Sequence, residues 1–274
     1  FYPEILEKLS TSLQQRGYHV LVFMAQQTAG NIDPVLQEIL DYQVDGIVLA
    51  SVAMSSMLAE RCDAAGIPVV LFNRAQQEDR FSTVTSDNFA GGRALAEFLV
   101  AGGHRRIGYI AGWEGASTQR DREAGFCAGL AEHGHRLFAR GVGDFQTETA
   151  AKAARAMFAA AEFPDAVFVA NDHMAFAVIE ELRGNLGLRV PEDVSVVGYD
   201  DVQLSRWSSF DLTTVRQPSG EMVAETVAAL MAQIEDGETE PRRVKIEGPL
   251  VVRGSARRPA DWKANWKECD DERL

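Results

Sequence analysis

The sequence predicts an α/β fold of the doubly wound type, in which helices cover both faces of a mainly parallel sheet. Two observations predict it. Short runs rich in Val and Ile recur along the 274 residues, and most are apolar almost throughout, which is typical of strands buried on both faces. Longer stretches with apolar residues at helical spacing lie between these runs. Repeated alternation of the two patterns is typical of open α/β sheets.

Seven apolar runs are predicted to be strands. Their ranges are 19–23, 46–50, 68–72, 106–111, 166–170, 194–199 and 213–216. The alternation has one break, at 82–87, where a short extended stretch precedes the next helix. No Pro- or Ser-rich linker and no internal repeat is visible, so the sequence does not indicate two independent domains in series.

Helix signals flank the predicted strands. Pro3 suits the first turn of a helix that Gly17 ends, and Asp87 is placed to cap a helix that a glycine pair ends. Apolar residues at helical spacing also run through 118–130 and 223–234.

Length and charge limit the classes of protein. The 274 residues, 46% of them hydrophobic, suffice for one large domain or two small ones with cores of their own. Lys and Arg number 27 against 40 Asp and Glu, a net charge of −13. Clustered positive charge is what binds a nucleic-acid backbone or an anionic membrane, so the composition argues against both for this stretch. No apolar run approaches the roughly 18 residues of a membrane span.

Motifs of redox, metal and enzyme chemistry are absent from the sequence. Cys62, Cys127 and Cys269 show no CxxC spacing, which argues against a disulfide framework or a zinc site and fits a cytoplasmic protein. No GxxxxGK[ST], GxSxG or HExxH occurs, and no GxGxxG follows a strand. The five histidines show no metal-ligand spacing. We therefore expect neither enzyme activity, nor a cofactor, nor a metal.

Polar side chains follow several predicted strands, at the sheet edge where open parallel sheets bind ligands. Carboxylates, amides and an arginine suit a small ligand that forms many hydrogen bonds. The alternative is that these residues form turns and helix caps. They are Asn73 and Arg74, Asn171 and Asp172, Asp200 and Asp201, and Gln217.

In each pair of polar residues after a strand, we expect the first and the second residue to have different roles. Asp172 and Asp201 come second and are well placed to cap helices. Asn171 and Asp200 come first, nearer the strand, and are better placed to face a ligand.

Two arginines stand near the predicted start of the helix over 118–130. Cations there oppose the helix dipole at a cost of about 0.3–1 kcal/mol each, so a function is a reasonable explanation. The alternative is a surface ion pair with Asp121 or Glu123, which is as good an explanation for Arg120 and a poorer one for Arg122.

Three aromatic residues lie beside the expected ligand edge. Phe1 and Tyr2 precede the first helix, and Phe145 lies in a loop after Gly143 and Asp144. Their rings could stack on the apolar face of a sugar or a base, and the alternative is ordinary core packing.

Ten short stretches of the sequence, taken in order, resemble the effector-binding core of the lactose-repressor (LacI/GalR) family of bacterial transcriptional regulators. Each stretch alone is weak evidence for the family, but the occurrence of all of them in the same order makes the resemblance specific. The matching stretches are 1–5, 45–49, 66–70, 86–91, 103–110, 122–126, 170–175, 190–201, 212–218 and 250–253.

The resemblance implies two Rossmann-like doubly wound subdomains joined by three crossover strands, a periplasmic-binding-protein-like fold of type I, with the ligand in the cleft between them. The crossovers would fall near Ser86, Gln217 and Ile246. The N-terminal subdomain would span 1–85 plus 218–245, the C-terminal one 86–217 plus 246–260, and 261–274 would be a charged tail.

The resemblance also implies a ligand-binding site. Arg122, in the phrase R-x-x-G-F, would anchor the effector, and Asp200, the first Asp of GYDD, would accept hydrogen bonds from it. The remaining residues would line the site: Asn171, Asn73, Phe145, Thr118, Phe1, Tyr2 and Gln217.

The chain departs from the family pattern at two places. The family's helix-turn-helix head, its hinge and the first strand of the N-terminal subdomain are expected before Phe1, so this chain is not expected to bind an operator by itself. Position 73 is Asn, where the family often has Asp, which lowers the local negative charge.

The expected partners are a sugar-like small molecule, a second copy of the chain in a homodimer, and operator DNA through a head domain only, with no membrane. Faces over 223–234 and 204–207 could meet the second protomer, or could belong to the chain's own core. Two rival functions share the scaffold: a periplasmic sugar-binding protein of a transporter, and a small-molecule enzyme.

Overall fold

The computed structural model describes the whole chain except residues 25–38, 40, 51–55, 76–79, 261 and 263–274. The chain divides into two compact units, which are described one at a time. The first unit comprises Phe1–Ser86 and Pro218–Ile246, and the second comprises Asp87–Gln217 and Glu247–Leu274. The predicted tail lies outside the described residues except for Trp262, whose ring packs edge-on against Phe98 with 5.1 Å between centroids.

The first unit is built on a parallel sheet in the order β1-β2-β3-β9. Helices α1 (Tyr2–Gln14) and α8 (Ser219–Glu235) pack on one face through Ile5, Leu9 and Leu230, and α3 (Ser56–Ala65) packs on the other through Ala59 and Cys62. Strand β2 is apolar and buried along its whole length because helices cover both faces of the sheet. The strands are β1 (Ile47–Ala50), β2 (Val69–Phe72), β3 (Ser82–Ser86) and β9 (Arg243–Ile246).

One expectation about the first unit needs correction, and one alternative that the sequence left open is answered. The strand predicted over 19–23 is not formed: residues 18–24 have no regular structure, and Leu21 and Val22 are more than half exposed. A strand requires a partner at its edge, and no described strand pairs with this segment. In addition, Val223 and Leu230 of α8 lie in the unit's own core, so core packing explains the apolar stripe over 223–234.

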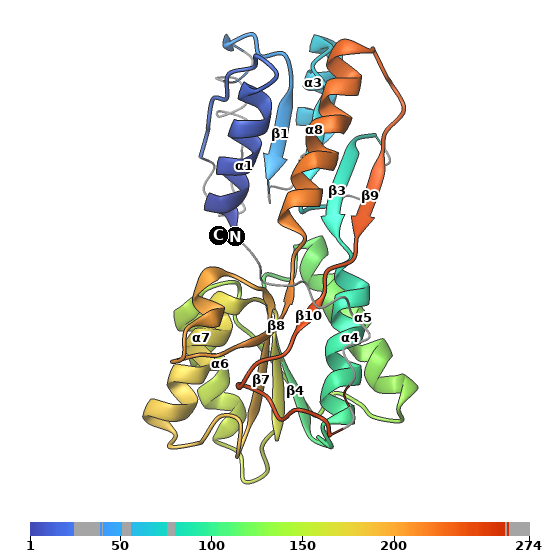
Figure 1. Cartoon of the computed structure of the whole chain (residues 1–274). Coiled ribbons are helices and arrows are strands. Elements are labelled where there is room, and N and C mark those ends of the chain that lie inside the picture. The colour runs from blue at the N-terminus through green and yellow to red at the C-terminus, as the bar shows by residue number, and fades with distance from the viewer. Residues whose placement is uncertain (25–38, 40, 51–55, 76–79, 261, 263–274) are drawn as a thin grey trace. The chain divides into compact units, whose positions relative to one another are not determined.

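The second unit is built on a six-stranded sheet in the order β10-β8-β7-β6-β4-β5. All pairs are parallel except β10 with β8, and in Figure 1 helices α4 and α5 cover one face and α6 and α7 the other. This confirms the predicted α/β fold. The strands are β4 (Ile107–Ala111), β5 (Ala139–Val142), β6 (Ala166–Val169), β7 (Ser195–Asp200), β8 (Thr213–Arg216) and β10 (Leu250–Val251). The helices are α4 (Asn88–Ala101), α5 (Ser117–Glu132), α6 (Thr147–Phe158) and α7 (Asp172–Glu180), with a π-helical turn at Glu181–Asn185 and a 3₁₀ turn at Gln203–Arg206.

Helices α4 and α5 approach each other unusually closely, and two glycines permit this. A Cβ at Gly92 would lie 2.2 Å from the carbonyl oxygen of Arg122, and one at Gly125 would lie 2.0 Å from that of Phe89. Backbone thus meets backbone at this interface, which brings the start of α4 next to the Arg122 side chain.

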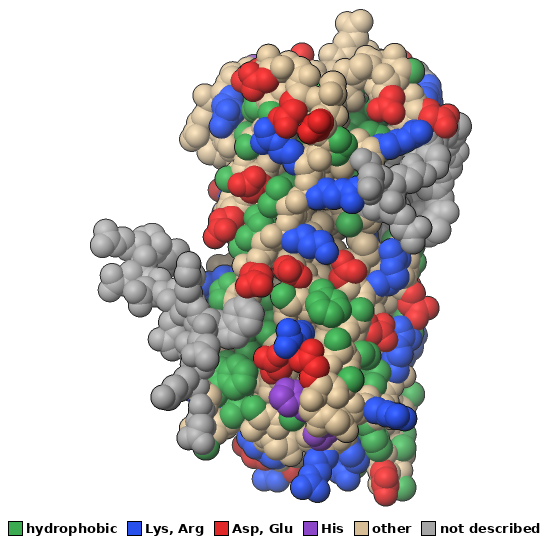
Figure 2. Space-filling view, turned by 90° about the vertical axis from the view of Figure 1, so that its right-hand side faces the viewer, with side chains coloured by type: hydrophobic (Ala, Val, Ile, Leu, Met, Phe, Trp, Pro, Cys, Tyr) green, Lys and Arg blue, Asp and Glu red, His purple; other side chains and the backbone are tan. Residues whose placement is uncertain are grey.

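The surface carries charges of both signs. Figure 2 shows one face, on which Lys and Arg are interspersed with Asp and Glu. Within the part of the chain that the structure describes, no helix has both the length and the hydropathy needed to cross a membrane.

Candidate functional site

Arg122, in the second turn of α5, has a buried and fixed side chain, 3% exposed. Its Nε donates to Asn88 Oδ1 at 2.8 Å, Nη1 donates to the carbonyl of Ala170 at 2.6 Å, and Nη2 donates to Asp200 Oδ1 at 3.3 Å. The guanidinium also lies 3.7 Å from the centroid of the Tyr199 ring, a cation–π contact. Among the described residues, three of its five N–H groups have an acceptor, and the other two retain hydrogen-bonding capacity.

Asp200 ends β7 and faces this guanidinium. Its Oδ1 accepts from Arg122 and from Gln217 Nε2 at 2.7 Å, and no contact of Oδ2 is found among the described residues. Burial raises the pKa of Asp200, and the charge of Arg122 acts in the opposite direction. Asp200 has a φ of +125°, a strained conformation for a residue other than glycine that persists only where the surroundings enforce it.

The residue next to Asp200 holds it in place. Asp201 also has a positive φ, +53°, and its buried carboxylate accepts from Arg216 Nε and from Arg253 Nη2, both at 2.6 Å. The expectation that Asp201 caps a helix is therefore wrong, because its side chain forms ion pairs with two arginines instead.

Asp172 holds the loop that follows Asp201 in place. Its carboxylate accepts from the backbone N–H of Val202 at 3.0 Å and from the hydroxyls of Ser205 and Thr214 at 2.7 Å each. Burial, with the nearby charge of Asp200, raises the pKa of Asp172 to about 7.

The helix cap that we expected at Asp172 is formed by Asn171. Its Oδ1 accepts from the N–H of Met174 at 3.0 Å at the start of α7. The amide Nδ2 of Asn171 has no acceptor among the described residues, so the ligand contact that the sequence predicts stays a prediction.

Gln217 follows β8 and is 3% exposed. Its side-chain amide donates to Asp200, while its Oε1 is buried without a hydrogen-bond partner among the described residues. A buried acceptor without a partner destabilises a structure by about 1–3 kcal/mol, so Oε1 is suited to receive a ligand hydroxyl.

Thr118 and Phe145 lie at the same edge of the sheet. Thr118 is in the first turn of α5, which follows β4, and it is 6% exposed. Phe145 has a φ of +56°, and its ring covers Gly112, where a Cβ would lie 2.2 Å from the ring. Of the six predicted residues of the second unit, Asp200 is the last residue of a parallel strand and the other five come after the carboxyl ends of such strands.

Arg120 is not part of this group. It is exposed, and its Nη1 donates to the carbonyls of Glu114 and Gly115 at 3.3 and 3.0 Å. The surface interpretation is therefore correct for Arg120, although its partners are carbonyls rather than Asp121 or Glu123.

The first unit places Asn73, Tyr2 and Phe1 together at the end of β2. Asn73 is 5% exposed with a φ of +53°, and its Nδ2 donates to the Tyr2 hydroxyl at 2.9 Å. Its Oδ1 is buried without a hydrogen-bond partner among the described residues. The Phe1 ring stacks on Phe72 at 6.4 Å, so core packing accounts for Phe1. Arg74, the next residue after Asn73, is also buried.

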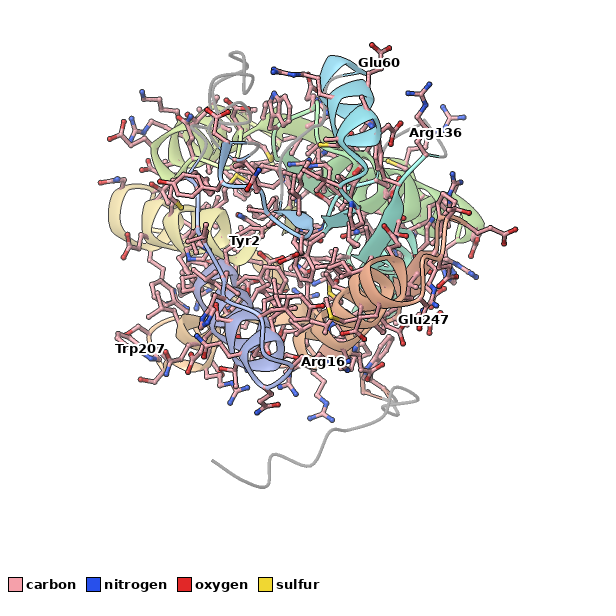
Figure 3. All side chains as sticks on the ribbon, turned by 90° about the horizontal axis from the view of Figure 1, so that it is seen from above. Tyr2, Arg16, Glu60, Arg136, Trp207 and Glu247 are labelled. Atoms are coloured by element: carbon pink, nitrogen blue, oxygen red, sulfur yellow. The ribbon has the colours of Figure 1, made fainter. Side chains whose placement is uncertain are left out.

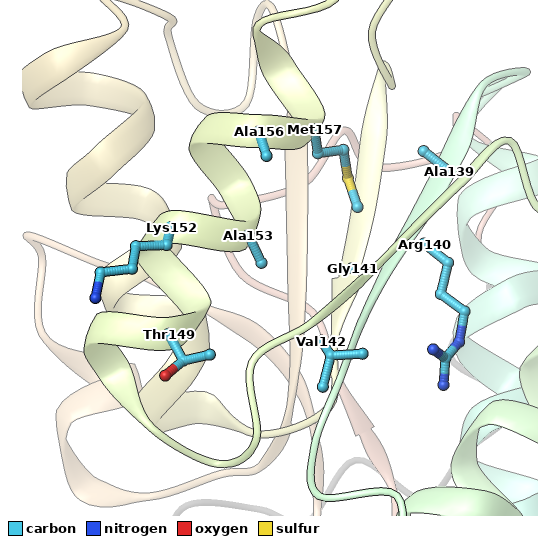
Figure 4. A pocket seen from close by; sticks show the side chains of 9 residues that line it. All are labelled: Ala139, Arg140, Gly141, Val142, Thr149, Lys152, Ala153, Ala156 and Met157. Carbon is cyan, nitrogen blue, oxygen red and sulfur yellow. The ribbon is translucent and has the colours of Figure 1, made fainter.

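A hollow of about 480 Å³ lies elsewhere in the second unit, beside the edge strand β5 and α6 (Figure 4). It contains none of the predicted site residues. Arg140 at its rim is paired with Glu123 at 2.6 Å and Glu114 at 2.8 Å. The described residues hold no group of three His, Cys, Asp or Glu side chains that could bind a metal.

Comparison with known proteins connects this geometry to a family. A family model described as a periplasmic binding protein-like domain matches residues 96–256. The HTH-type transcriptional regulator CelR of Thermobifida fusca is 36% identical over 263 residues, which is 93% of this chain and 76% of that protein. The repressor PurR of Pectobacterium carotovorum is 31% identical over 259 residues, with coverage of 93% and 76%.

Solved structures agree. The CelR–cellobiose complex has 33% identity and a TM-score of 0.85, covering 93% of this chain and 79% of that chain. A LacI transcriptional regulator from a Rhodococcus species has 26% identity and a TM-score of 0.84, covering 94% of each chain. These relatives are regulators rather than binding proteins of transporters, which removes the first rival function. The chain belongs to the LacI family of transcriptional regulators and corresponds to their effector-binding core.

Proposed function

We propose that the chain binds a sugar-like effector through Arg122, Asp200 and Gln217, and that this binding changes the occupancy of operator DNA by the regulator. The observation that carries the proposal is the buried Arg122–Asp200 pair, at the carboxyl edge of a parallel sheet, with hydrogen-bonding capacity left over.

The leftover groups match the chemistry of a polyhydroxylated ligand. Asp200 Oδ2 and Gln217 Oε1 are acceptors, and two N–H groups of Arg122 are donors. A sugar hydroxyl both donates and accepts, so vicinal hydroxyls can satisfy an acceptor and a donor together. Phe145 supplies an apolar ring for the face of a pyranose, and Thr118 and the Nδ2 of Asn171 supply further polar contacts.

The first unit has polar and aromatic groups of its own among the predicted site residues. Asn73 Oδ1 is an unsatisfied buried acceptor, and the Tyr2 hydroxyl beside it is a second polar group. Phe1 supports both through its ring contacts with Tyr2 and Phe72. Loss of ligand affinity in Asn73→Ala would support direct contact with this group.

Among sugars, the CelR complex points to cellobiose as the first compound to test, because that structure is 33% identical to this chain and was solved with cellobiose. A ligand that binds one conformation of the chain more tightly shifts the population toward it. By reciprocal linkage, effector and operator then change each other's affinity by the same factor. Operator contact would be made by a separate helix-turn-helix head in a cytoplasmic homodimer.

For the dimer contact we propose the segment around Trp207. Its side chain is 58% exposed directly after the 3₁₀ turn, and Figure 3 shows it at the periphery. A large exposed aromatic is typical of a protein contact.

A thermal-shift screen tests the effector proposal. The panel is cellobiose, glucose, ribose, sugar phosphates, nucleosides and purines. A compound present at 100 times its Kd stabilises the fold by about 2.7 kcal/mol, which is a readily measured shift in Tm. A sugar that shifts Tm supports the proposal. A shift produced only by a purine or nucleoside contradicts the sugar class, and no shift from any compound contradicts the site.

The same compounds test the enzyme alternative. We expect each ligand that shifts Tm to be recovered unchanged after long incubation with the protein. Formation of a product would overturn the proposal in favour of catalysis.

A further inference from the structure

The chain passes between the two units three times, at Ser86–Asp87, Gln217–Pro218 and Ile246–Glu247. These three places are called the first, second and third connection. In the second unit, residues within seven positions of each connection are hydrogen-bonded to the group formed by Arg122, Asp200 and Asp201. All of the contacts below lie within that unit.

The first connection meets Arg122. Asn88, two residues into the second unit, is 3% exposed, and its Oδ1 accepts from Arg122 Nε at 2.8 Å. Tyr199 lies under the same guanidinium, and its hydroxyl is 3.5 Å from the carbonyl oxygen of Asp87.

The second connection meets Asp200 twice. The backbone N–H of Gln217 donates to the carbonyl of Asp200 at 3.3 Å, and its side-chain amide donates to the carboxylate at 2.7 Å. Gln217 is the last residue of the second unit before the chain crosses.

The third connection meets Asp201. Arg253, in the segment after Glu247, donates to Asp201 at 2.6 Å and also to the carbonyl of Leu212 at 2.7 Å. Arg216, next to the second connection, donates to the other Asp201 oxygen at 2.6 Å, and its backbone N–H donates to the carbonyl of Pro249 at 2.9 Å. One carboxylate therefore joins the second and third connections.

We propose that Asp201 is a positioning residue that links the Asp200 site to the second and third connections, so that a change at Asp200 is passed to both. The inference rests on the proposed function, since it assigns the route by which an effector at Asp200 would alter the connections. The two residues are consecutive and both have positive φ, a conformation that persists in residues other than glycine only where the surroundings enforce it. Both Asp201 oxygens are occupied and the side chain is 0% exposed, so it has no capacity left to bind a ligand itself.

Amide hydrogen exchange on the full chain without ligand tests this route, because exchange reports local opening segment by segment. The variants are Asp200→Asn, Asp201→Asn and the double variant. The control is Asp193→Asn, which removes a carboxylate paired with Arg189 at 2.7 Å in the same unit, away from the connections.

We expect Asp200→Asn alone to speed exchange in the segment 247–253 about fivefold, although Asp200 has no hydrogen bond to that segment. In a chain that already carries Asp201→Asn, adding Asp200→Asn should not speed exchange in the segment 247–253 any further. If the ion pairs of Asp201 were only structural, Asp201→Asn would lower Tm, but the effect of Asp200→Asn on exchange would be the same with and without Asp201→Asn. Equal effects of Asp200→Asn in both backgrounds, or no effect in the unaltered chain, would overturn the inference.

Arg253→Lys is a second variant in case Asp201→Asn does not fold. It keeps the positive charge but cannot reach Asp201 and Leu212 together, so it should abolish the same dependence. Measuring the binding of the panel compounds in parallel distinguishes failure of the inference from failure of the proposed function. If no panel compound binds, the proposed function fails while the ligand-free result still decides the inference. If a sugar binds and the exchange changes stay independent, only the inference fails.

Discussion

The guanidinium Nη2 of Arg122 lies 3.3 Å from Oδ1 of Asp200, and the two side chains are 3% and 10% exposed. A buried pair of opposite charges is retained at a desolvation cost, and a purely structural pair is often replaceable by apolar residues. Among the described residues, the pair also leaves an acceptor and two donors without a partner, which the proposed polar ligand would need. Asp172 and Asp201 hold the loop that presents it.

The close approach of α4 and α5 predicts a severe effect of Gly125→Ala. The new Cβ would lie 2.0 Å from the backbone carbonyl of Phe89, and a backbone atom cannot move aside as a side chain can. We expect a loss of about 1–3 kcal/mol in the free energy of unfolding, measured by urea denaturation. Gly220→Ala in the first turn of α8 is the control, because nothing lies within 4 Å of its Cβ. Equal stability of the two variants would contradict the described helix packing.

A pH dependence of stability is predicted at His104. Its side chain is 0% exposed, and burial lowers its pKa from 6.5, although Asp165, 3.4 Å away, acts in the opposite direction. The unfolded chain therefore binds the proton more readily than the folded one. The contribution of His104 to stability is fully present above pH 6.5 and is lost as the pH falls through the folded-state pKa.

His104→Gln should therefore lose less stability between pH 7 and pH 5 than the unaltered chain, as measured by urea denaturation at each pH. The control is His133→Gln, at an exposed position after α5. If His104→Gln and the unaltered chain have the same pH profile, the pKa of His104 is not lowered in the fold.

The exposed ring of Trp207 predicts an effect on self-association. Trp207→Ser should raise the dimer dissociation constant at least about tenfold, the effect of losing a well-buried aromatic contact at an interface. Sedimentation velocity over a range of concentrations measures it. Tyr42→Ser is a matched control, because Tyr42 is also 58% exposed but lies in the first unit. A dimer constant unchanged by Trp207→Ser, or changed equally by Tyr42→Ser, would exclude this contact.

Much of the fold was predictable because central parallel strands are apolar on both faces. The predicted runs that form β1, β2, β4, β6 and β7 have this pattern, whereas the predicted run that forms β8 is Thr-Thr-Val-Arg. Strand β5, with the sequence Ala-Arg-Gly-Val, was missed because it is an edge strand whose residues alternate between half-buried and exposed. The segment 19–23 was predicted wrongly because its sequence is strand-like, but pairing depends on a neighbour that sequence pattern does not reveal.

The candidate site also has a part that the sequence predicts and a part that it does not. The positions of Asp200 and Gln217 after strands could be predicted, since topology alone places strand ends at one edge. The roles of Asn88 and Asp201 could not, because they depend on contacts with Arg122 and Arg253, which are 34 and 52 residues away in sequence. Asn171 rather than Asp172 caps α7, because the choice of capping side chain depends on local geometry, which residue type does not fix.

The most direct test of the account is calorimetric titration of cellobiose, or of the sugar with the largest thermal shift, into the unaltered chain, Arg122→Met and Asp200→Asn. Each variant loses a hydrogen bond to a charged group, so we expect each to weaken binding by about 1.5–3 kcal/mol, or roughly 10- to 150-fold in Kd. Arg189→Met, at an exposed arginine of the same unit, should bind like the unaltered chain. Circular dichroism confirms that each variant is folded. Affinities of both site variants within about twofold of the unaltered chain would contradict the assignment of Arg122 and Asp200 as the effector site.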